Sequence, residues 1–344
     1  MPAEQFRRDR IAALADFSVG IGLEIGPLDR PMALKSECEV RYVDVFDAPT
    51  IRAHYADDPA VDTAALPDID FFLHTADGTI QSLVDAVKAD APYSWAVASH
   101  VIEHVPDLVG WLGQISEVLV DGGTLVLAVP DRRYTFDALR PPTTVGQILQ
   151  ANNAGDTIPS VRAVYDYFRS VVHASAADLW AGIPATEDDR MFDLRGTLDQ
   201  VRLATEEGRY VDCHVWMFTP AEFVAQITEL GRMGLIDLYV ERVLPTARNE
   251  IEFFAALTRA PRNATADELA QLQDAVPLDH LAPAAEPAEP AEPAEPASEV
   301  PPAAAEAQRG GAPAWAKPAF ALSAKEIRLI NAKRRVINTL RRRK

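Results

Sequence analysis

Three histidines, His100, His104 and His214, are the residues in this 344-residue chain whose side chains most readily support catalysis. Imidazole is the natural proton acceptor near neutral pH, so each of the three is a candidate base. The spacing of His100, Glu103 and His104 also places three side chains on one face of a helical turn, where they could hold a metal ion. We favour an interpretation without a metal.

Acidic residues follow two apolar runs, at the points where buried strands would end. Asp44 lies 20 residues after Glu24, and a carboxylate there suits the two hydroxyls of a ribose, with a turn or N-cap aspartate as the alternative. Asp77 and Gly78 follow the run 69–73. Asp77 could accept a hydrogen bond from an adenine amino group, although Asp-Gly is also a turn signal. The two acids together predict a nucleoside site.

The first apolar run, which begins at residue 21, breaks off at Glu24 and Gly26. Glycine allows a close approach of the backbone to a ligand, so we expect this turn to lie against a nucleoside cofactor. Only eight residues separate Pro31 from Val40, where the next strand should begin. This spacing leaves no room for a full helix between the first two strands.

Strands and helices alternate through residues 19–260. We expect strands at 21–25, 39–45, 69–73, 95–98, 124–129, 236–240 and 250–257, and helices at 4–17, 49–55, 80–88, 108–119 and 220–230. Residues 1–18 would form the N-terminal helical segment. The fold class is therefore α/β, a mostly parallel seven-stranded sheet with helices on both faces and ligands at the carboxyl ends of the strands.

The stretch 131–213 interrupts the alternation after the fifth strand. Within it we expect one helical segment over 160–180, followed by the polar stretch 187–207. An insertion beside a ligand-binding edge suits a lid or substrate cap, and a dimerisation arm is the alternative. Arginines 132, 133 and 140 hint at an anionic acceptor, but they could equally pair with acidic residues of the domain.

Net charge is unevenly distributed along the chain. The total is −18, yet residues 321–344 carry a balance of +8, which leaves −26 for the rest. Such an acidic body repels a phosphate backbone, so we expect no nucleic acid partner for the main domain. Two cysteines, no apolar run of membrane-spanning length and a charged start predict a cytoplasmic protein.

The C-terminal part differs in composition from the rest. Residues 261–320 read as a linker rich in Pro, Ala and Glu, with Ala-Glu-Pro repeated four times over 285–296. Residues 321–344 predict a basic amphipathic helix that begins with a capping box of Ser323 and Glu326. Such a helix suits an anionic membrane surface or an acidic protein, which would make the protein peripheral to the membrane, and a solvated helix is the alternative.

Four blocks of the sequence together resemble the class I S-adenosylmethionine-dependent methyltransferases, and among them the type 11-like small-molecule group. The blocks are Leu-Glu-Ile-Gly at 23–26, Asp44, Ser-His-Val-Ile-Glu-His-Val at 99–105, and Gly-Gly-Thr-Leu-Val-Leu-Ala-Val-Pro-Asp at 122–131. The resemblance extends over residues 19–258 apart from much of the insertion, and block 99–105 is its most specific part.

This resemblance implies a Rossmann-like fold and S-adenosylmethionine as the cofactor. The implied cofactor-binding residues are Glu24, Gly26 and Pro27 at the methionine end, Asp44 at the ribose, Asp77 and Gly78 near the adenine, and Ser99 and His100 beside the sulfonium. The resemblance also implies a structural role for His104, and most members have such turn histidines without a metal.

The function that follows is methyl transfer to an O, N or C atom of a small-molecule or glycan-like acceptor. We expect catalysis to depend mainly on placing the acceptor in line with the methyl group, and His100 and His214 are the candidate catalytic bases. The alternative is a catalytically degenerate methyltransferase fold that acts as a scaffold or binding module through its linker and basic tail. A dinucleotide dehydrogenase is disfavoured because Gly-x-Gly-x-x-Gly is absent.

Overall fold

The computed structural model of the chain describes residues 3–75, 78–207 and 209–274. Strands in this part form one seven-stranded sheet with the order β3-β2-β1-β4-β5-β7-β6. They are β1 (Gly22–Ile25), β2 (Val40–Asp44), β3 (Phe71–Phe72), β4 (Tyr93–Ser99), β5 (Leu119–Pro130), β6 (Leu238–Leu244) and β7 (Glu252–Arg259). Strands β1 to β5 pair in parallel, whereas β7 runs antiparallel to β5 and β6. The predicted mostly parallel seven-stranded sheet is confirmed.

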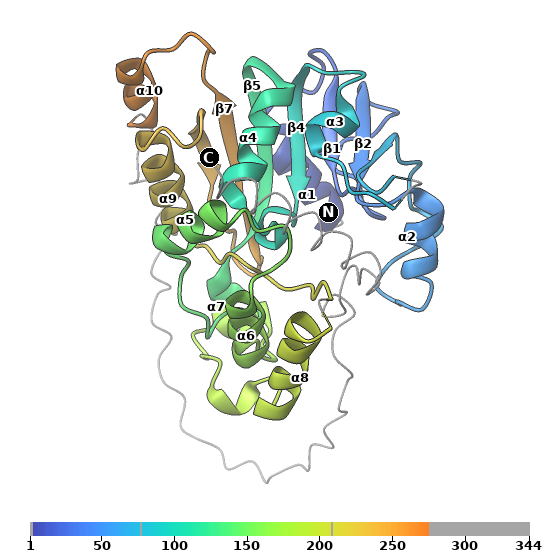
Figure 1. The fold of residues 1–344 in the computed structure, drawn as a ribbon, viewed down its shortest axis with the longest axis vertical. Coiled ribbons are helices and arrows are strands. Elements are labelled where there is room, and N and C mark those ends of the chain that lie inside the picture. Colours follow the sequence, from blue (N-terminus) through green and yellow to red (C-terminus); the bar gives the residue numbers. More distant parts are fainter. Residues whose placement is uncertain (1–2, 76–77, 208, 275–344) are drawn as a thin grey trace, which may run out of the picture.

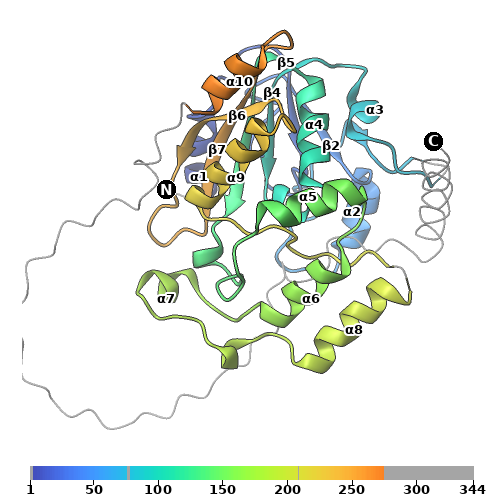
Figure 2. The same ribbon diagram turned by 60° about the vertical axis from the view of Figure 1, so that its left-hand side comes forward.

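Helices cover both faces of this sheet (Figures 1 and 2). Side chains of β4 alternate between the faces, so Ala96 and Ala98 join one core cluster while Trp95 and Val97 join the other. Helices α3 (Leu83–Val87), α4 (Leu108–Val118) and α9 (Pro220–Arg232) pack in the first cluster, and α1 (Ala3–Ala12) packs in the second through Ile11. The strand order reverses between β1 and β4, which is where ligands bind in open α/β sheets.

Local capping chemistry sets the starts of the helices beside this edge. Asp107 caps α4 by accepting a hydrogen bond from the backbone N–H of Gly110, and Asp47 caps α2 (Ala48–His54) in the same way. Thr219 and Glu222 form a capping box on α9, as its predicted N-cap requires. The expected strand 124–129 is longer in the structure, because β5 begins at Leu119, directly after α4.

The insertion contains α5 (Val145–Ala154), α6 (Val161–Ser170), α7 (Ala176–Trp180) and α8 (Leu194–Thr205). The prediction of one helix over 160–180 is wrong, because Val172 leaves the helix to form a β-bridge with Arg190. Helix α8 lies in the stretch expected to be only polar, and its Thr197 hydroxyl reaches the carbonyl of Phe168 on α6 at 3.2 Å. Figure 1 shows α6, α7 and α8 beyond the end of the sheet toward which β4 points.

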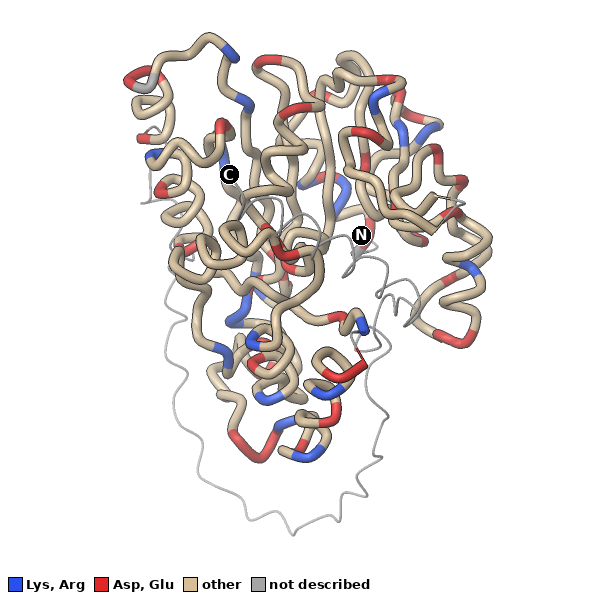
Figure 3. Tube along the Cα trace, in the orientation of Figure 1, with Lys and Arg blue, Asp and Glu red and all other residues tan. Residues whose placement is uncertain are grey.

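The folded core extends past residue 260. Helix α10 (Ala266–Gln273) lies in the segment predicted as a linker, and the Gln273 amide donates to the carbonyl of Leu238 at 3.2 Å. The rest of the predicted linker and the predicted basic helix 321–344 lie outside the described residues. Figure 3 shows acidic and basic positions dispersed over both the sheet region and the insertion. Among the helices described, none combines the length and apolar character needed to cross a membrane.

Gly22 in β1 is packed so closely that a methyl group there would overlap the indole ring of Trp95. We expect Gly22→Ala to lower the free energy of unfolding by about 1–3 kcal/mol, because overpacking displaces a buried ring. Gly113→Ala in α4 is the matched control: nothing lies within 4 Å of its added methyl, so it should stabilise by up to about 1 kcal/mol. Urea denaturation measures both, and equal effects would contradict this account of the packing.

Candidate active site

One large cavity opens at the carboxyl ends of β1, β2 and β4, with a volume of about 1660 Å³. Its wall on the sheet side includes Gly26, Asp44 and Ser99, and its wall on the insertion side includes Phe136, Tyr167 and Tyr210. Pockets for one small ligand usually measure about 300–1,000 Å³. This cavity therefore has room for two ligands side by side.

The turn after β1 is held by Glu24 rather than by a helix. The buried Glu24 carboxylate accepts hydrogen bonds from the backbone N–H groups of Met32 at 2.7 Å and Ala33 at 2.9 Å. Burial raises the pKa of Glu24 to about 7 despite these two bonds. Gly26 adopts a left-handed φ of +65° and lines the cavity together with Pro27. Glu24 thus shapes the turn that places Gly26 at the cavity.

Asp44 ends β2 with its side chain at the cavity. One carboxylate oxygen accepts the backbone N–H of Val45 at 2.6 Å, and burial raises the pKa of Asp44 to about 6. Gly78 also lines the cavity and has a positive φ of +80°. Asp77, predicted near the adenine, lies outside the described residues.

Ser99 and His100 end β4, and His100 has a left-handed φ of +55°, uncommon for a residue with a side chain. His100 Nε2 lies 2.7 Å from a carboxylate oxygen of Glu252, and Nδ1 lies 3.4 Å from Glu103. Burial alone would lower the pKa of His100, but these two carboxylates raise it to about 9. Arg7 of α1 completes the network by donating to Glu252 and to the Ser99 hydroxyl at 2.7 Å.

The other two histidines are each held through Nδ1 by a carboxylate. His104 Nδ1 lies 3.0 Å from Asp212, and His214 Nδ1 lies 2.6 Å from Asp137. Burial would lower the pKa of His104, but Asp212 raises it to about 9. Asp137 is itself buried and paired with Arg140 at 2.8 Å, and its contacts with His214 and Arg140 lower its pKa to about 2 against the effect of burial.

All three arginines at the start of the insertion pair with carboxylates of the protein. The pairs are Arg132 with Glu222 at 3.0 Å, Arg133 with Asp131 at 2.6 Å and Arg140 with Asp137 at 2.8 Å. Of the two explanations that the sequence left open, pairing within the domain is the one observed. These arginines therefore give no support to an anionic acceptor.

Most of the predicted site residues lie around one cavity. They are Glu24, Gly26, Pro27, Asp44, Gly78, Ser99, His100 and His214. Sequence reasoning missed Arg7, Asp137, Asp212 and Glu252, which hold the site histidines or Ser99. Only Glu252 could have been found from the sequence. It lies near the start of a predicted strand that is otherwise rich in apolar residues, and an acid buried in such a strand needs a partner.

Comparison with known proteins identifies the family. A model of the family described as methyltransferase domain matches residues 3–180, more than half of the chain. The chain belongs to this methyltransferase family. No curated protein matches the sequence.

Several solved structures of methyltransferases are similar to this chain at low sequence identity. An S-adenosylmethionine-dependent methyltransferase from Mesorhizobium loti has 13% identity and a TM-score of 0.37, covering 75% of this chain and 98% of that one. The CcbJ methyltransferase from Streptomyces caelestis has 12% identity and a TM-score of 0.37, with coverages of 75% and 96%. The N-methyltransferase NodS from Bradyrhizobium japonicum has 12% identity and a TM-score of 0.33, with coverages of 76% and 98%. Similarity at this level does not transfer an acceptor to this chain.

The cofactor of this methyltransferase is S-adenosylmethionine, and the residues present fit it. A carboxylate at the end of β2, Asp44, and a left-handed glycine after β1, Gly26, face one cavity where the strand order reverses. A nucleoside needs an acceptor for its ribose hydroxyls and a backbone without a side chain at close approach. Both features are present here.

Cofactor binding should depend on pH through Asp44. Two ribose hydroxyls require the ionised carboxylate, and burial raises the pKa of Asp44 to about 6. Affinity for S-adenosylmethionine should therefore be constant above about pH 7 and fall as the pH drops through 6, by up to about tenfold per pH unit. Calorimetry between pH 5 and pH 8 tests this, with Asp44→Asn as a control that should bind weakly without this dependence. A flat profile for the unmodified chain would refute the assignment.

Proposed function

We propose that this chain transfers the methyl group of S-adenosylmethionine to an O, N or C atom of a small-molecule or glycan-like acceptor bound under the insertion. The observation that carries the proposal is the continuity of one cavity from Asp44 and Gly26 to His214 and the insertion. The cofactor supplies an electrophilic methyl group on a positively charged sulfur. The chain then has to place an acceptor in line with that methyl group and exclude water.

Of the two histidines predicted as catalytic, His214 is the one that we propose acts on the acceptor. The two ring nitrogens of His100 face the carboxylates of Glu103 and Glu252. His100 therefore has no free nitrogen to accept a proton from the acceptor, and we assign it the role of a fixed charge beside the cofactor. Asp137 holds Nδ1 of His214, which fixes the ring and leaves Nε2 for the cavity. This difference in contacts supports different proposed roles for the two histidines.

The insertion is proposed as the cap that selects the acceptor. Phe136 and Tyr167 pack against the ring of His214, with ring centroids 4.7 and 5.9 Å away, and both line the cavity. Tyr134, also at the cavity, stacks on Trp180 at 3.8 Å. These aromatic walls favour an acceptor with an apolar or ring-shaped body.

Product analysis tests this function directly. The full chain is incubated with S-adenosylmethionine and a panel of hydroxylated, aminated and glycan-like small molecules, and mass spectrometry follows S-adenosylhomocysteine and the methylated product together. We expect both to appear for at least one acceptor class. Failure of the chain to bind S-adenosylmethionine at all would refute the proposal and favour the alternative of a scaffold.

A further inference from the structure

We propose that Glu103, His104 and His214 bind a divalent transition-metal ion, Zn²⁺ in the first instance, at the acceptor end of the cavity. The binding site itself is inferred from geometry, and its part in catalysis rests on the proposed function. From the sequence, only His100, Glu103 and His104 could be grouped in one turn. In the structure, the third residue near Glu103 and His104 is His214, which comes from a distant part of the chain, and His100 is not part of the group.

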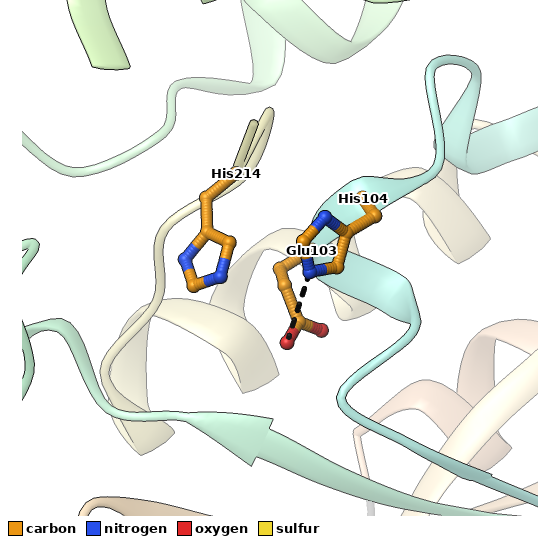
Figure 4. Close-up of side chains that lie close together, drawn as sticks. All are labelled: Glu103, His104 and His214. Carbon is orange, nitrogen blue, oxygen red and sulfur yellow. Dashed lines mark ion pairs between the residues drawn. The ribbon is translucent and has the colours of Figure 1, made fainter. Parts of the chain in front are cut away.

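The three side chains converge from two segments of the chain (Figure 4). Glu103 and His104 lie in the short helix η1 (Ile102–His104), and His214 lies in the segment that follows the insertion. One potential ligand atom from each lies within 4.8 Å of the other two, and His104 Nε2 is 3.9 Å from Glu103. The Glu103 carbonyl accepts the backbone N–H of Val215 at 2.7 Å, which fixes the His214 segment against η1.

Glu103 carries the strongest indication that these residues bind a cation. Its side chain is 1% exposed, and neither carboxylate oxygen accepts a hydrogen bond within the described residues. Its ion-pair contacts in the described residues, with His100 at 3.4 Å and His104 at 3.9 Å, are long and are not hydrogen bonds. A buried carboxylate held only at these distances is costly, and a metal ion between Glu103 and the imidazoles of His104 and His214 would supply a closer partner.

Both histidines are already held as metal ligands usually are. A ligating imidazole typically donates its other N–H to a carboxylate, which fixes the ring and makes the free nitrogen a better ligand. Asp212 contacts Nδ1 of His104 at 3.0 Å, and Asp137 contacts Nδ1 of His214 at 2.6 Å. In each ring Nε2 is then the nitrogen left for an ion.

Two imidazoles and one carboxylate suit a transition metal better than Mg²⁺ or Ca²⁺, which prefer oxygen ligands. Because all three residues line the cavity, the remaining coordination positions would face the acceptor. A cation there would hold an acceptor oxygen and lower the pKa of a hydroxyl, whose proton leaves to solvent. Of the O, N and C atoms allowed by the proposed function, the metal ion therefore favours an oxygen atom as the methyl acceptor. His214 would then act on that oxygen by holding the metal ion.

Metal binding to the full chain tests the site without an acceptor. The protein is treated with EDTA, dialysed and titrated with Zn²⁺ by calorimetry, and Co²⁺ is added separately to record its visible spectrum. We expect one ion per chain, and a Co²⁺ spectrum that reports nitrogen and oxygen ligands. Glu103→Gln and His214→Ala should each weaken Zn²⁺ binding more than tenfold, and Asp212→Asn about 10- to 100-fold. His173→Ala, at an exposed histidine, is the matched control and should bind like the unmodified chain.

Titration of each variant with S-adenosylmethionine shows whether its cavity is still folded. No Zn²⁺ binding by the unmodified chain, or undiminished binding by the His214→Ala and Asp212→Asn variants, overturns the metal site. If Glu103→Gln does not fold, the His214→Ala and Asp212→Asn variants decide the question. Retained S-adenosylmethionine binding without Zn²⁺ binding removes the metal inference alone, whereas loss of cofactor binding in the unmodified chain removes the proposed function.

Discussion

Replacing His214 by alanine is expected to lower kcat about 100-fold or more while leaving the affinity for S-adenosylmethionine nearly unchanged. General acid–base groups contribute roughly 10²–10⁴-fold to rates, and a metal ligand at this position would contribute no less. The proposed cofactor residues lie at the end of β2 (Asp44) and in the turn after β1 (Gly26), whereas His214 lies in the segment after the insertion, so their contacts should survive the substitution. Steady-state kinetics on the acceptor found by product analysis, with calorimetry for the cofactor, measures both quantities.

The matched control for this substitution is again His173→Ala, which removes an exposed imidazole and should leave kcat unchanged. His214→Gln is a second variant that keeps the volume of the side chain nearly constant and should be as inactive as His214→Ala. Near-normal kcat in either His214 variant would show that the acceptor is bound elsewhere.

Removal of the Asp137 carboxylate should destabilise the whole domain. Asp137 and Arg140 are both buried, with the carboxylate 2.8 Å from the guanidinium and 2.6 Å from His214. Asp137→Ala leaves the Arg140 charge buried and without its carboxylate, which typically costs about 3–5 kcal/mol. Urea denaturation in the presence of EDTA measures the loss of unfolding free energy apart from any metal contribution.

Asp166→Ala is the control for this prediction, because it removes the partly exposed partner of Arg162 and should cost less than about 1 kcal/mol. The double substitution of Asp137→Leu with Arg140→Met should recover part of the loss, since no unpaired charge remains. An effect of Asp137→Ala no larger than that of the control would mean that the buried pair does not stabilise the domain.

The sheet and the cofactor edge could be predicted from the sequence because their signals are local. Asp44 and Ser99 each follow an apolar run, and a polar residue at the end of a buried strand marks the carboxyl edge of a parallel sheet. The short spacing from Pro31 to Val40 likewise predicted a turn without a helix. Only the structure shows that Glu24 holds this turn through backbone N–H groups.

The partners of the histidines could not be predicted, because they are set by contacts between distant segments. Asp137 and Asp212 lie at the two ends of the insertion, and nothing in their local sequence distinguishes them from solvated acids. Helix α8 was missed for a related reason. Its apolar residues Leu194, Leu198 and Val201 recur at helical spacing but are outnumbered by the polar residues of the stretch 187–207, and in the structure the helix packs on α6.

A crystal structure of the full chain with S-adenosylhomocysteine and Zn²⁺ is the measurement that tests the account most directly. We expect the ribose hydroxyls on Asp44, the thioether sulfur beside Ser99 and open toward His214, and the ion held by Glu103, His104 and His214. A ligand whose ribose lies away from Asp44, or whose sulfur points away from His214, would contradict the proposed methyl transfer under the insertion.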